Sequence, residues 1–163
     1  MPLLEFAVES TVPDNTSFTV LTALRELGYQ ELERVERVDL LRLRLQDGAM
    51  STEECGRALM RAEVVFNPNK HRLTHAGANG ASGGFEAVVA DKDDDATGLR
   101  DLLGGRFGIL GLEQVERAVA WRLHERNGPA GKDRLDWACR ELLANPYSQT
   151  YAIRTRPKYD AVK

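Results

Sequence analysis

The residues best suited to chemistry in this sequence form an acidic run, Asp91-Lys92-Asp93-Asp94-Asp95, which resembles the start of a calcium-binding loop. Such a loop needs glycine at its sixth position for a sharp turn and glutamate at its twelfth as a ligand. Ala96 and Leu102 occupy these positions here. Carboxylates also stabilise the partial positive charge at the start of a helix. The run therefore predicts an acidic surface loop that caps a helix, without a metal site.

Two cysteines could supply a nucleophile or a disulfide, but their positions argue against both. Cys55 and Cys139 lie within helical patterns and far apart in the sequence, unlike the close pairs of a zinc knuckle or a disulfide framework. Cys139 falls on the apolar stripe of its helix, without a nucleophile turn or a motif histidine. It is predicted to be a small core residue rather than a glutaminase nucleophile.

Neither the histidines nor the glycine-rich segments have the spacing of a ligand site. His71, His75 and His124 form no pair four residues apart on a helix, and His124, on a polar face, is expected to be solvated. The segments "GANGASGG" (77–84) and "LLGGRFG" (102–108) lack the GK[ST] ending of a phosphate loop. The first is expected to be part of a linker and the second a helix-ending turn. No catalytic, cofactor-binding or metal site is predicted.

Composition narrows the class of protein. With 163 residues and 42% hydrophobic content, the chain suits one compact domain or two very small ones. It has no apolar run of roughly 20 residues and no basic leader in residues 1–8. Its net charge is -3, with Lys and Arg scattered among Asp and Glu. We expect a cytoplasmic protein whose partners include neither nucleic acid nor a membrane.

An internal repeat divides the chain. A shift of 80 lays "ELERVERVDLLRLRLQDG" (31–48) over "GLEQVERAVAWRLHERNG" (111–128) with eight identities. Asn67-Pro68 and Asn145-Pro146 align at a shift of 78. Two matches in the same order indicate a duplication. The expected units are a first repeat (1–74), a Gly/Ala/Ser linker (75–83), a second repeat (84–156) and a flexible tail (157–163).

Each repeat reads as strand, helix, strand, helix, strand. In the first, residues 3–8 are extended, a helix begins near Asp14 and ends at Gly28, and residues 41–45 alternate as a strand with one wet face. Ser51 and Glu54 form a capping box for the second helix. The first helix carries an apolar stripe of Phe18, Leu21, Leu24 and Leu27.

Each Asn-Pro pair is expected to turn the chain from the second helix into the last strand. Proline cannot continue a helix, and it pushes the preceding residue out of helical conformation. The last strand, 149–156, then places Tyr151 and Ile153 on one face. A unit of this size has a marginal core and open sheet edges. We therefore expect an α+β pseudo-dimer in which the repeats cover each other.

The segment "CRELLANP" (139–146), followed by Tyr151, resembles the C-terminal helix and last strand of PurS, the small subunit of phosphoribosylformylglycinamidine synthase. The element order, the acidic loop and the "VER" segments (35–37 and 115–117) fit that family too. The resemblance covers nearly the whole chain as two family-sized units. It implies two PurS-like, ferredoxin-like-related subdomains, each a three-stranded antiparallel sheet with two helices, in an intrachain pseudo-dimer.

What the resemblance implies about function is an accessory role in de novo purine (IMP) biosynthesis. The family's complex uses ATP and glutamine to convert formylglycinamide ribonucleotide into the amidine. A glutaminase subunit releases ammonia, and a large synthetase subunit activates the amide with ATP and Mg. PurS-like chains bridge the two and support ammonia transfer. The resemblance thus implies a non-catalytic subunit without cofactor of its own, which could also form a homodimer.

Two departures from the family stand beside this resemblance. The family follows its strand arginine with Gly-Lys, whereas Arg37 and Arg117 precede Val38-Asp39 and Ala118-Val119, and the first repeat has "VVFNP" in place of "LLANP". These departures favour an alternative, a stand-alone duplicated α+β module that binds a ligand or protein in a regulatory role. Candidate partner-interface residues are Arg37, Arg117, Asn67, Pro68, Asn145, Pro146 and Tyr151.

The sequence leaves open the orientation of Arg117 and the contacts of the two tryptophans. It places Arg117 on the face of Val115 and Val119, so that either a bulge rotates Arg117 outward or its guanidinium emerges at a contact. Trp121 and Trp137 are expected in the core or between the repeats, with a partner contact as the alternative.

Overall fold

The protein is an α+β fold in which helices and antiparallel strands alternate along the chain. The computed structural model describes residues 2–163, without the side chains of residues 78 and 79. The elements are β1 (Leu3–Ser10), α1 (Asn15–Glu26), β2 (Leu32–Leu45), α2 (Thr52–Met60), β3 (His71–Asp91), α3 (Thr97–Gly105), β4 (Leu112–Glu125), β5 (Gly128–Pro129), α4 (Lys132–Ala138) with a π-helical turn (Cys139–Leu143), and β6 (Gln149–Ala161).

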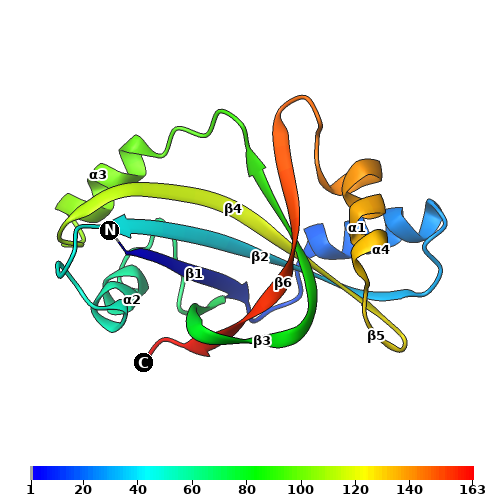
Figure 1. The fold of residues 1–163 in the computed structure, drawn as a ribbon, viewed down its shortest axis with the longest axis horizontal. Coiled ribbons are helices and arrows are strands. Elements are labelled where there is room, and N and C mark those ends of the chain that lie inside the picture. The colour runs from blue at the N-terminus through cyan, green and yellow to red at the C-terminus, as the bar shows by residue number, and fades with distance from the viewer. Residues whose placement is uncertain (1) are drawn as a thin grey trace.

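The strands form one sheet that closes on itself. Its order is β5-β4-β2-β1-β3-β6, and an additional pairing of β3 with β4 completes a ring of four strands. The ring closes because β3 is long and bends around the sheet (Figure 1). Its first part pairs with β1, where His75 lies opposite Phe6, and its last part pairs with β4, where Val88 lies opposite Ala120.

The strand registers repeat between the two halves of the chain. In the first half Phe6 of β1 lies between Leu41 of β2 and His75 of β3. In the second half Ala87 of β3 lies between Trp121 of β4 and Ile153 of β6. The three strands are therefore equivalent at shifts of 81, 80 and 78 residues (87 − 6, 121 − 41 and 153 − 75).

The halves are joined by the pairing of β2 with β4, which runs almost the whole length of both strands. At its centre Asp39 lies opposite Val119, the position equivalent to it by the shift of 80. An antiparallel pair of equivalent strands centred in this way has an approximate two-fold axis between these two residues. The middle strand is thus continuous, and residues 41–45 are only its last part.

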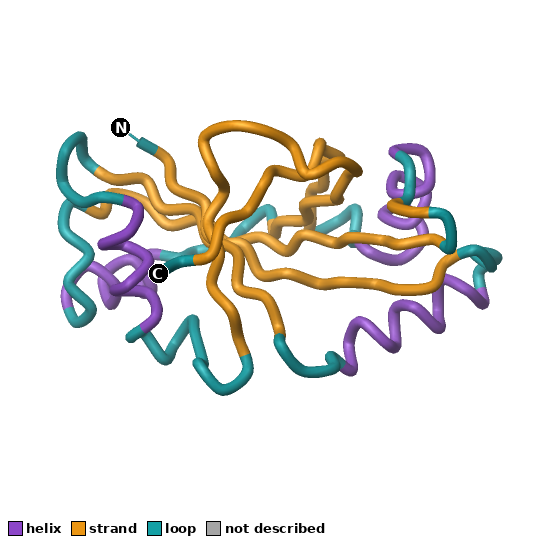
Figure 2. The backbone as a smooth tube through the Cα atoms, turned by 90° about the horizontal axis from the view of Figure 1, so that it is seen from below, coloured by secondary structure: helices purple, strands orange, loops and turns teal. Residues whose placement is uncertain are grey.

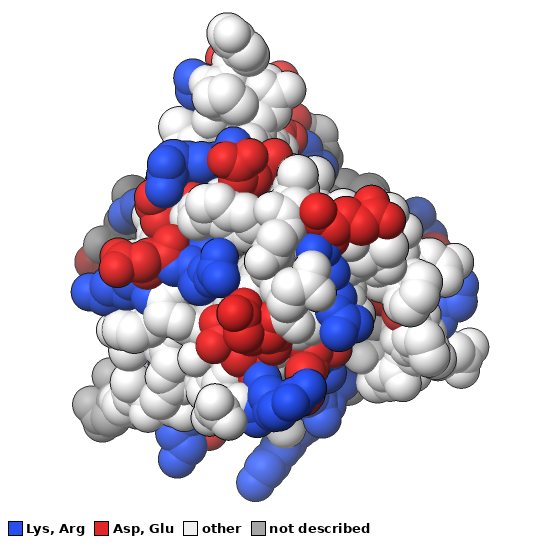
Figure 3. All heavy atoms as spheres, turned by 90° about the vertical axis from the view of Figure 1, so that its right-hand side faces the viewer, with Lys and Arg blue, Asp and Glu red and all other residues white. Residues whose placement is uncertain are grey.

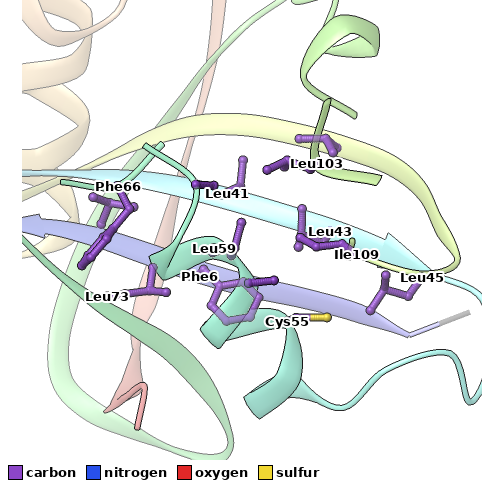
Figure 4. Close-up of a cluster of buried hydrophobic side chains, with 14 of the residues drawn as sticks. Phe6, Leu41, Leu43, Leu45, Cys55, Leu59, Phe66, Leu73, Leu103 and Ile109 are labelled. Carbon is purple, nitrogen blue, oxygen red and sulfur yellow. The ribbon is translucent and has the colours of Figure 1, made fainter. Parts of the chain in front are cut away.

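The two larger of three apolar clusters exchange their first helices. One core combines β1, the end of β2 and α2 with Leu103 of α3 and Ile109 from the second half. Figure 4 shows these two side chains close to Leu43. The other core combines α4 and strands of the second half with Leu24 of α1. Both ribbon views accordingly show α2 with α3 at one end and α1 with α4 at the other (Figures 1 and 2).

Several local expectations are confirmed and others are wrong. Ser51 and Glu54 form the capping box at the start of α2. On α1, Leu24 is fully buried, but Phe18 is 70% exposed and Leu27 is also exposed, so the predicted stripe is wider than the buried face. No helix in the described residues is long and apolar enough to cross a bilayer.

The expected linker and tail are both wrong, because these residues belong to strands. Residues 75–83 lie within β3, where Ala81 is opposite Pro157 between two irregularities of register. Residues 157–161 extend β6, and Ala161 pairs with Thr74 in the first half. Gly84 has a φ of +97°, and a Cβ there would lie 2.9 Å from the Pro129 side chain. Glycines in this segment allow a tight bend of the strand rather than a free connection.

The sheet face turned away from the helices contains a buried network of acids and arginines. Glu86 is fully buried, and Arg122 donates from Nε to its Oε1 at 3.1 Å. Arg122 also donates to Glu9 at 3.1 Å. Buried charges of this kind require opposite charges and hydrogen bonds because water cannot solvate them. The alternating charges of the strands, which suggest a wet face, are therefore largely interior.

Arg154 of β6 connects the two halves within this network. It donates to Glu5 at 2.8 Å and to Glu86 at 2.6 Å, and Tyr159 donates to Glu5 at 3.1 Å. Burial favours the neutral form of Glu5, but hydrogen bonds from Arg154 and Arg42 outweigh burial and lower its pKa. β6 is therefore joined to β1 through these charged side chains, while its backbone pairs with the first part of β3.

Candidate functional site

The candidate site is an open cleft of about 600 Å³ between the two helix pairs, over the centre of the β2–β4 pairing. We call it the central cleft. Most of its lining consists of side chains that the approximate two-fold axis relates to one another. These include Arg37 with Arg117, Asp39 with Val119, Leu41 with Trp121, Val65 with Leu143, and Val8 with Val89.

Arg117 lies in the central cleft without any bulge. The register of β2 with β4 is unbroken from Arg34 to Arg44, so alternation alone places Arg117 on the helix side of the sheet. Its Nε and Nη2 donate to the two carboxylate oxygens of Asp94 at 3.0 and 2.5 Å. This hydrogen bonding lowers the pKa of Asp94 and raises that of Arg117. The bulge alternative is wrong, and the guanidinium is already paired.

Arg37 occupies the equivalent position but lacks an equivalent partner. Its Nη2 lies 3.4 Å from Oδ1 of Asp39, its neighbour on the same face of the strand. It makes no other polar contact to the side chains that the structure describes. The Arg37 side chain is 34% exposed, and its guanidinium has five N–H donors, so it can bind a further group.

The asymmetry results from a sequence difference at a single position that precedes the first helix of each half. Thr16 donates its backbone N–H to Asp14 at 3.1 Å, and Thr97 donates to Asp95 at 3.0 Å, so Asp14 and Asp95 are equivalent. The residue before each is then Pro13 in the first half and Asp94 in the second. Proline supplies no carboxylate, and Arg37 consequently has no counterpart of the Arg117–Asp94 pair.

The acidic run acts as a capping surface loop, as expected from the sequence. Asp95 accepts from the first residue of α3, and Asp94 pairs with Arg117. Asp91 accepts from Gln149 at 2.9 Å, and Lys92 donates to the carbonyl of Pro146 at 3.0 Å. Within residues 2–163, apart from the two side chains left out, no group of His, Cys, Asp and Glu is placed to hold a metal ion.

The two Asn-Pro pairs form matching turns outside the cleft. Asn67 accepts on its side chain from Asn69 N–H at 2.9 Å, and Asn145 accepts from Tyr147 N–H at the same distance. The backbone N–H of Asn67 donates to His71 Nδ1, and that of Asn145 donates to Gln149 Oε1. These contacts complete a turn into the last strand of each half. Asn67, Pro68, Asn145 and Pro146 thus share a structural role.

Tyr151 also lies outside the cleft, on the helix side of β6. Its hydroxyl donates to Asp136 of α4 at 2.7 Å, and this hydrogen bond raises the pKa of Tyr151. Trp121 is buried and lines the cleft. Trp137 of α4 packs edge-on against Tyr29 of the first half at 5.9 Å. The expectation that the tryptophans pack in the core or between the halves is confirmed.

The remaining chemical candidates are internal. The expectation that His124 is solvated is wrong, because its Nε2 lies 2.9 Å from Glu36 Oε1 and only 20% of its side chain is exposed. His75 packs against Phe6. Burial raises the pKa of the Cys139 thiol to about 12, which keeps it protonated and unreactive. Its assignment to the core is confirmed.

Surface charge does not mark another site at the α1–α4 end of the molecule. Figure 3 shows this end, where basic and acidic side chains are interspersed in small groups. Neither sign forms a continuous patch on this face, so it provides no concentrated field for a strongly charged partner.

Asp39 is the charged residue of the cleft that lies in no sequence motif, whereas Asp94 belongs to the acidic run. No local pattern marks Asp39, because its place at the centre of the β2–β4 pairing depends on the strand register. The signal for Asp94 was its offset from the helix-capping Asp95. The chain matches no protein-family model and no curated protein.

Proposed function

We propose that the chain is a non-catalytic accessory subunit of phosphoribosylformylglycinamidine synthase, with two PurS-like units fused as an intrachain pseudo-dimer. In this role it bridges the glutaminase and the ATP-dependent synthetase and supports ammonia transfer between them. The chain uses no cofactor of its own, while the synthetase uses ATP and Mg. The proposal places it in cytoplasmic purine biosynthesis.

The observation that supports this role best is the β2–β4 pairing centred on Asp39 and Val119. PurS-like chains are expected to act in pairs, and this chain forms a pair internally, with exchanged helices in each core. The order β2-β1-β3 in the first half recurs as β4-β3-β6 in the second. The resemblance of "CRELLANP" then connects the fold with a family.

The second Asn-Pro turn provides a surface for a partner. Tyr147 follows Asn145-Pro146 and is 92% exposed on a turn fixed by hydrogen bonds. An exposed aromatic on a rigid turn has the properties of a binding anchor, because little conformational entropy is lost on contact. The equivalent residue of the first turn is Asn69, which provides a matched control.

Co-purification tests the role directly. The tagged chain should retain a glutaminase and a synthetase from its own cells, and native mass spectrometry should show one tandem chain per synthetase. Tyr147→Ser should weaken this retention about tenfold or more, whereas Asn69→Ser should not. Deletion of the gene should create a purine requirement. Growth without purine, or two tandem chains per synthetase, would contradict the proposal.

A second role, as a stand-alone regulatory module, is favoured by the central cleft. The cleft combines apolar walls with a guanidinium whose one ion pair is with Asp39 on the same strand, a combination that a purely structural subunit does not require. Purine-independent growth of the deletion strain, together with ligand binding by the purified chain, would favour this role.

A further inference from the structure

Arg37 of the central cleft lacks the doubly hydrogen-bonded carboxylate partner that its equivalent, Arg117, has. In the second half the carboxylate of Asp94 receives two hydrogen bonds from Arg117. In the first half Pro13 stands at the equivalent position, in the wall of a smaller neighbouring pocket that Arg37 also lines. Arg37 itself has only its lateral contact with Asp39 at 3.4 Å. A guanidinium prefers a carboxylate bound through two parallel hydrogen bonds. The vacant half of the arrangement therefore matches the carboxylate of a ligand.

Asp39 adds a group of opposite sign beside this guanidinium. Its side chain is 55% exposed, and it lies at the centre of the β2–β4 pairing. The other two aspartates of the cleft have partners, since Asp94 binds Arg117 and Asp91 accepts from Gln149. Arg37 and Asp39 thus form an accessible pair of charges two residues apart on one strand.

The charge balance of the cleft favours a zwitterion over an anion. Two arginines and three aspartates line it, a formal charge of -1 (2 − 3). A phosphate or a dicarboxylate would increase this negative charge, whereas a ligand with one carboxylate and one ammonium leaves it unchanged. The walls next to the charges are apolar, with Leu41, Val65, Trp121 and Leu143.

We propose that the central cleft binds a free α-amino acid with an apolar side chain. Arg37 binds its carboxylate, Asp39 accepts from its ammonium group, and its side chain packs against the apolar walls. The volume of about 600 Å³ is sufficient for such a ligand. The site does not depend on the proposed role in amidine synthesis.

Titration of the full chain with three probes tests the ligand class. L-Leucine should bind, whereas L-leucinamide, which lacks the carboxylate, and N-acetyl-L-leucine, which lacks the ammonium, should each bind about tenfold more weakly or worse. Isothermal titration calorimetry gives the affinities, and amide chemical shifts should change along β2 and β4 only with leucine. Absence of leucine binding at about 10 mM would overturn the proposal, as would equal binding of either derivative.

The approximate symmetry supplies matched variants. Arg37→Gln should abolish leucine binding, and Asp39→Asn should weaken it about tenfold. Arg117→Gln alters the equivalent position and should change the affinity by less than about threefold, because Arg117 is already paired. Circular dichroism verifies that each variant is folded. Equal losses from Arg37→Gln and Arg117→Gln would overturn the assignment.

A further variant rebuilds the missing partner. Pro13→Asp places a carboxylate where Asp94 stands in the second half, and it should compete with the ligand for Arg37. We expect leucine affinity to fall about tenfold in this variant. An unchanged affinity in a folded Pro13→Asp protein would show that Arg37 does not bind the ligand carboxylate. These results leave the co-purification test untouched, so the two proposals can fail separately.

Discussion

The two halves of the molecule carry the same ion pair but bury it to different extents. Arg42 donates Nε to Glu5 at 2.8 Å, with 25% and 11% of the two side chains exposed. Arg122 donates Nε to Glu86 at 3.1 Å, with only 2% and 0% exposed. The pairing is the same because β1–β2 and β3–β4 have the same register. Arg154 of β6 contacts both glutamates, so the two pairs belong to one network in which the Arg122–Glu86 pair is the more buried.

The difference shows that the register of the duplicated strands persists while their surroundings diverge. The same pattern holds on the helix side, where Arg117 has a carboxylate partner and Arg37 does not. Equivalent positions in the two halves therefore form natural matched pairs for experiments. Four predictions use them, beginning with the largest expected effect.

Separating the halves should abolish folding of each as a monomer. Residues 1–79 include α1, whose Leu24 is buried only in a core built with α4 and β4. Without that core its apolar face remains in water, and a chain of this length has little other burial. Circular dichroism and size-exclusion chromatography of residues 1–79 and 80–163 should show unfolded or self-associated fragments that reassemble when mixed. A folded monomer of either fragment would refute the exchange of helices.

Neutralising the glutamate of each ion pair should lower the free energy of unfolding by different amounts. Glu86→Gln removes the fully buried carboxylate that accepts from both Arg122 and Arg154. Although Glu9 and Glu5 still contact the two arginines, this loss of a buried charge should lower the free energy of unfolding by about 3 kcal/mol. Glu5→Gln, in the more exposed pair, should cost about 1 kcal/mol. Urea unfolding at pH 7 measures both values. Equal costs would show that burial does not distinguish the pairs.

Lowering the pH should reveal a difference between Glu36 and its equivalent Glu116 in how much each contributes to stability. The close contact of His124, whose Nε2 lies 2.9 Å from Glu36 Oε1, lowers the pKa of Glu36 from 4.5 to about 2. Since the pKa is lower in the folded protein, the stabilisation is complete above pH 4.5 and is lost as the pH falls toward 2. After allowance for partial exposure it is about 1–2 kcal/mol.

The comparison variant for this pH effect is Glu36→Gln, with Glu116→Gln as the control. Thermal unfolding between pH 6 and pH 2.5 should show a smaller loss of stability in Glu36→Gln than in the unmodified protein. Glu116→Gln should follow the unmodified protein. Parallel curves for all three proteins would remove Glu36 as a source of the acid sensitivity.

The smallest effect is expected at the paired arginine of the cleft. Asp94→Asn removes an exposed ion pair, and such pairs contribute less than about 1 kcal/mol. Its stability should be close to that of the unmodified protein, and sodium chloride should reduce the difference further. A loss as large as that of Glu86→Gln would mean that the pair supports the fold rather than the site.

The sequence predicts the local structure well because its signals are short in range. Capping by Ser51 and Asp95, the Asn-Pro turns and the repeat itself depend on residues within a few positions or on direct alignment. The exchange of helices cannot be read in this way, because Leu24 and Leu103 look equally apolar whichever core they enter. Charged strand faces mislead similarly, since Glu86 resembles a solvent-facing residue in the sequence but is fully buried and hydrogen-bonded to Arg154 of β6.

The errors at residues 75–83 and 157–163 have a related cause. Small and polar residues have weak strand signals, but a long neighbouring strand can still supply backbone partners. β3 and β6 pair with each other on both sides of the glycine-rich bend. For the site, strand alternation places Arg37 and Arg117 on one face of the sheet. The central position of Asp39, in contrast, depends on the β2–β4 register.

Pro13 has a consequence for the origin of the cleft. In an assembly of two identical subunits, any residue change is made twice, and both ends of a shared groove alter together. A single covalent chain removes that constraint: proline can replace one acid while aspartate is retained at the other end. The gene fusion therefore permits an asymmetric binding site, in which one arginine is neutralised by the chain's own carboxylate and the other can accept a ligand.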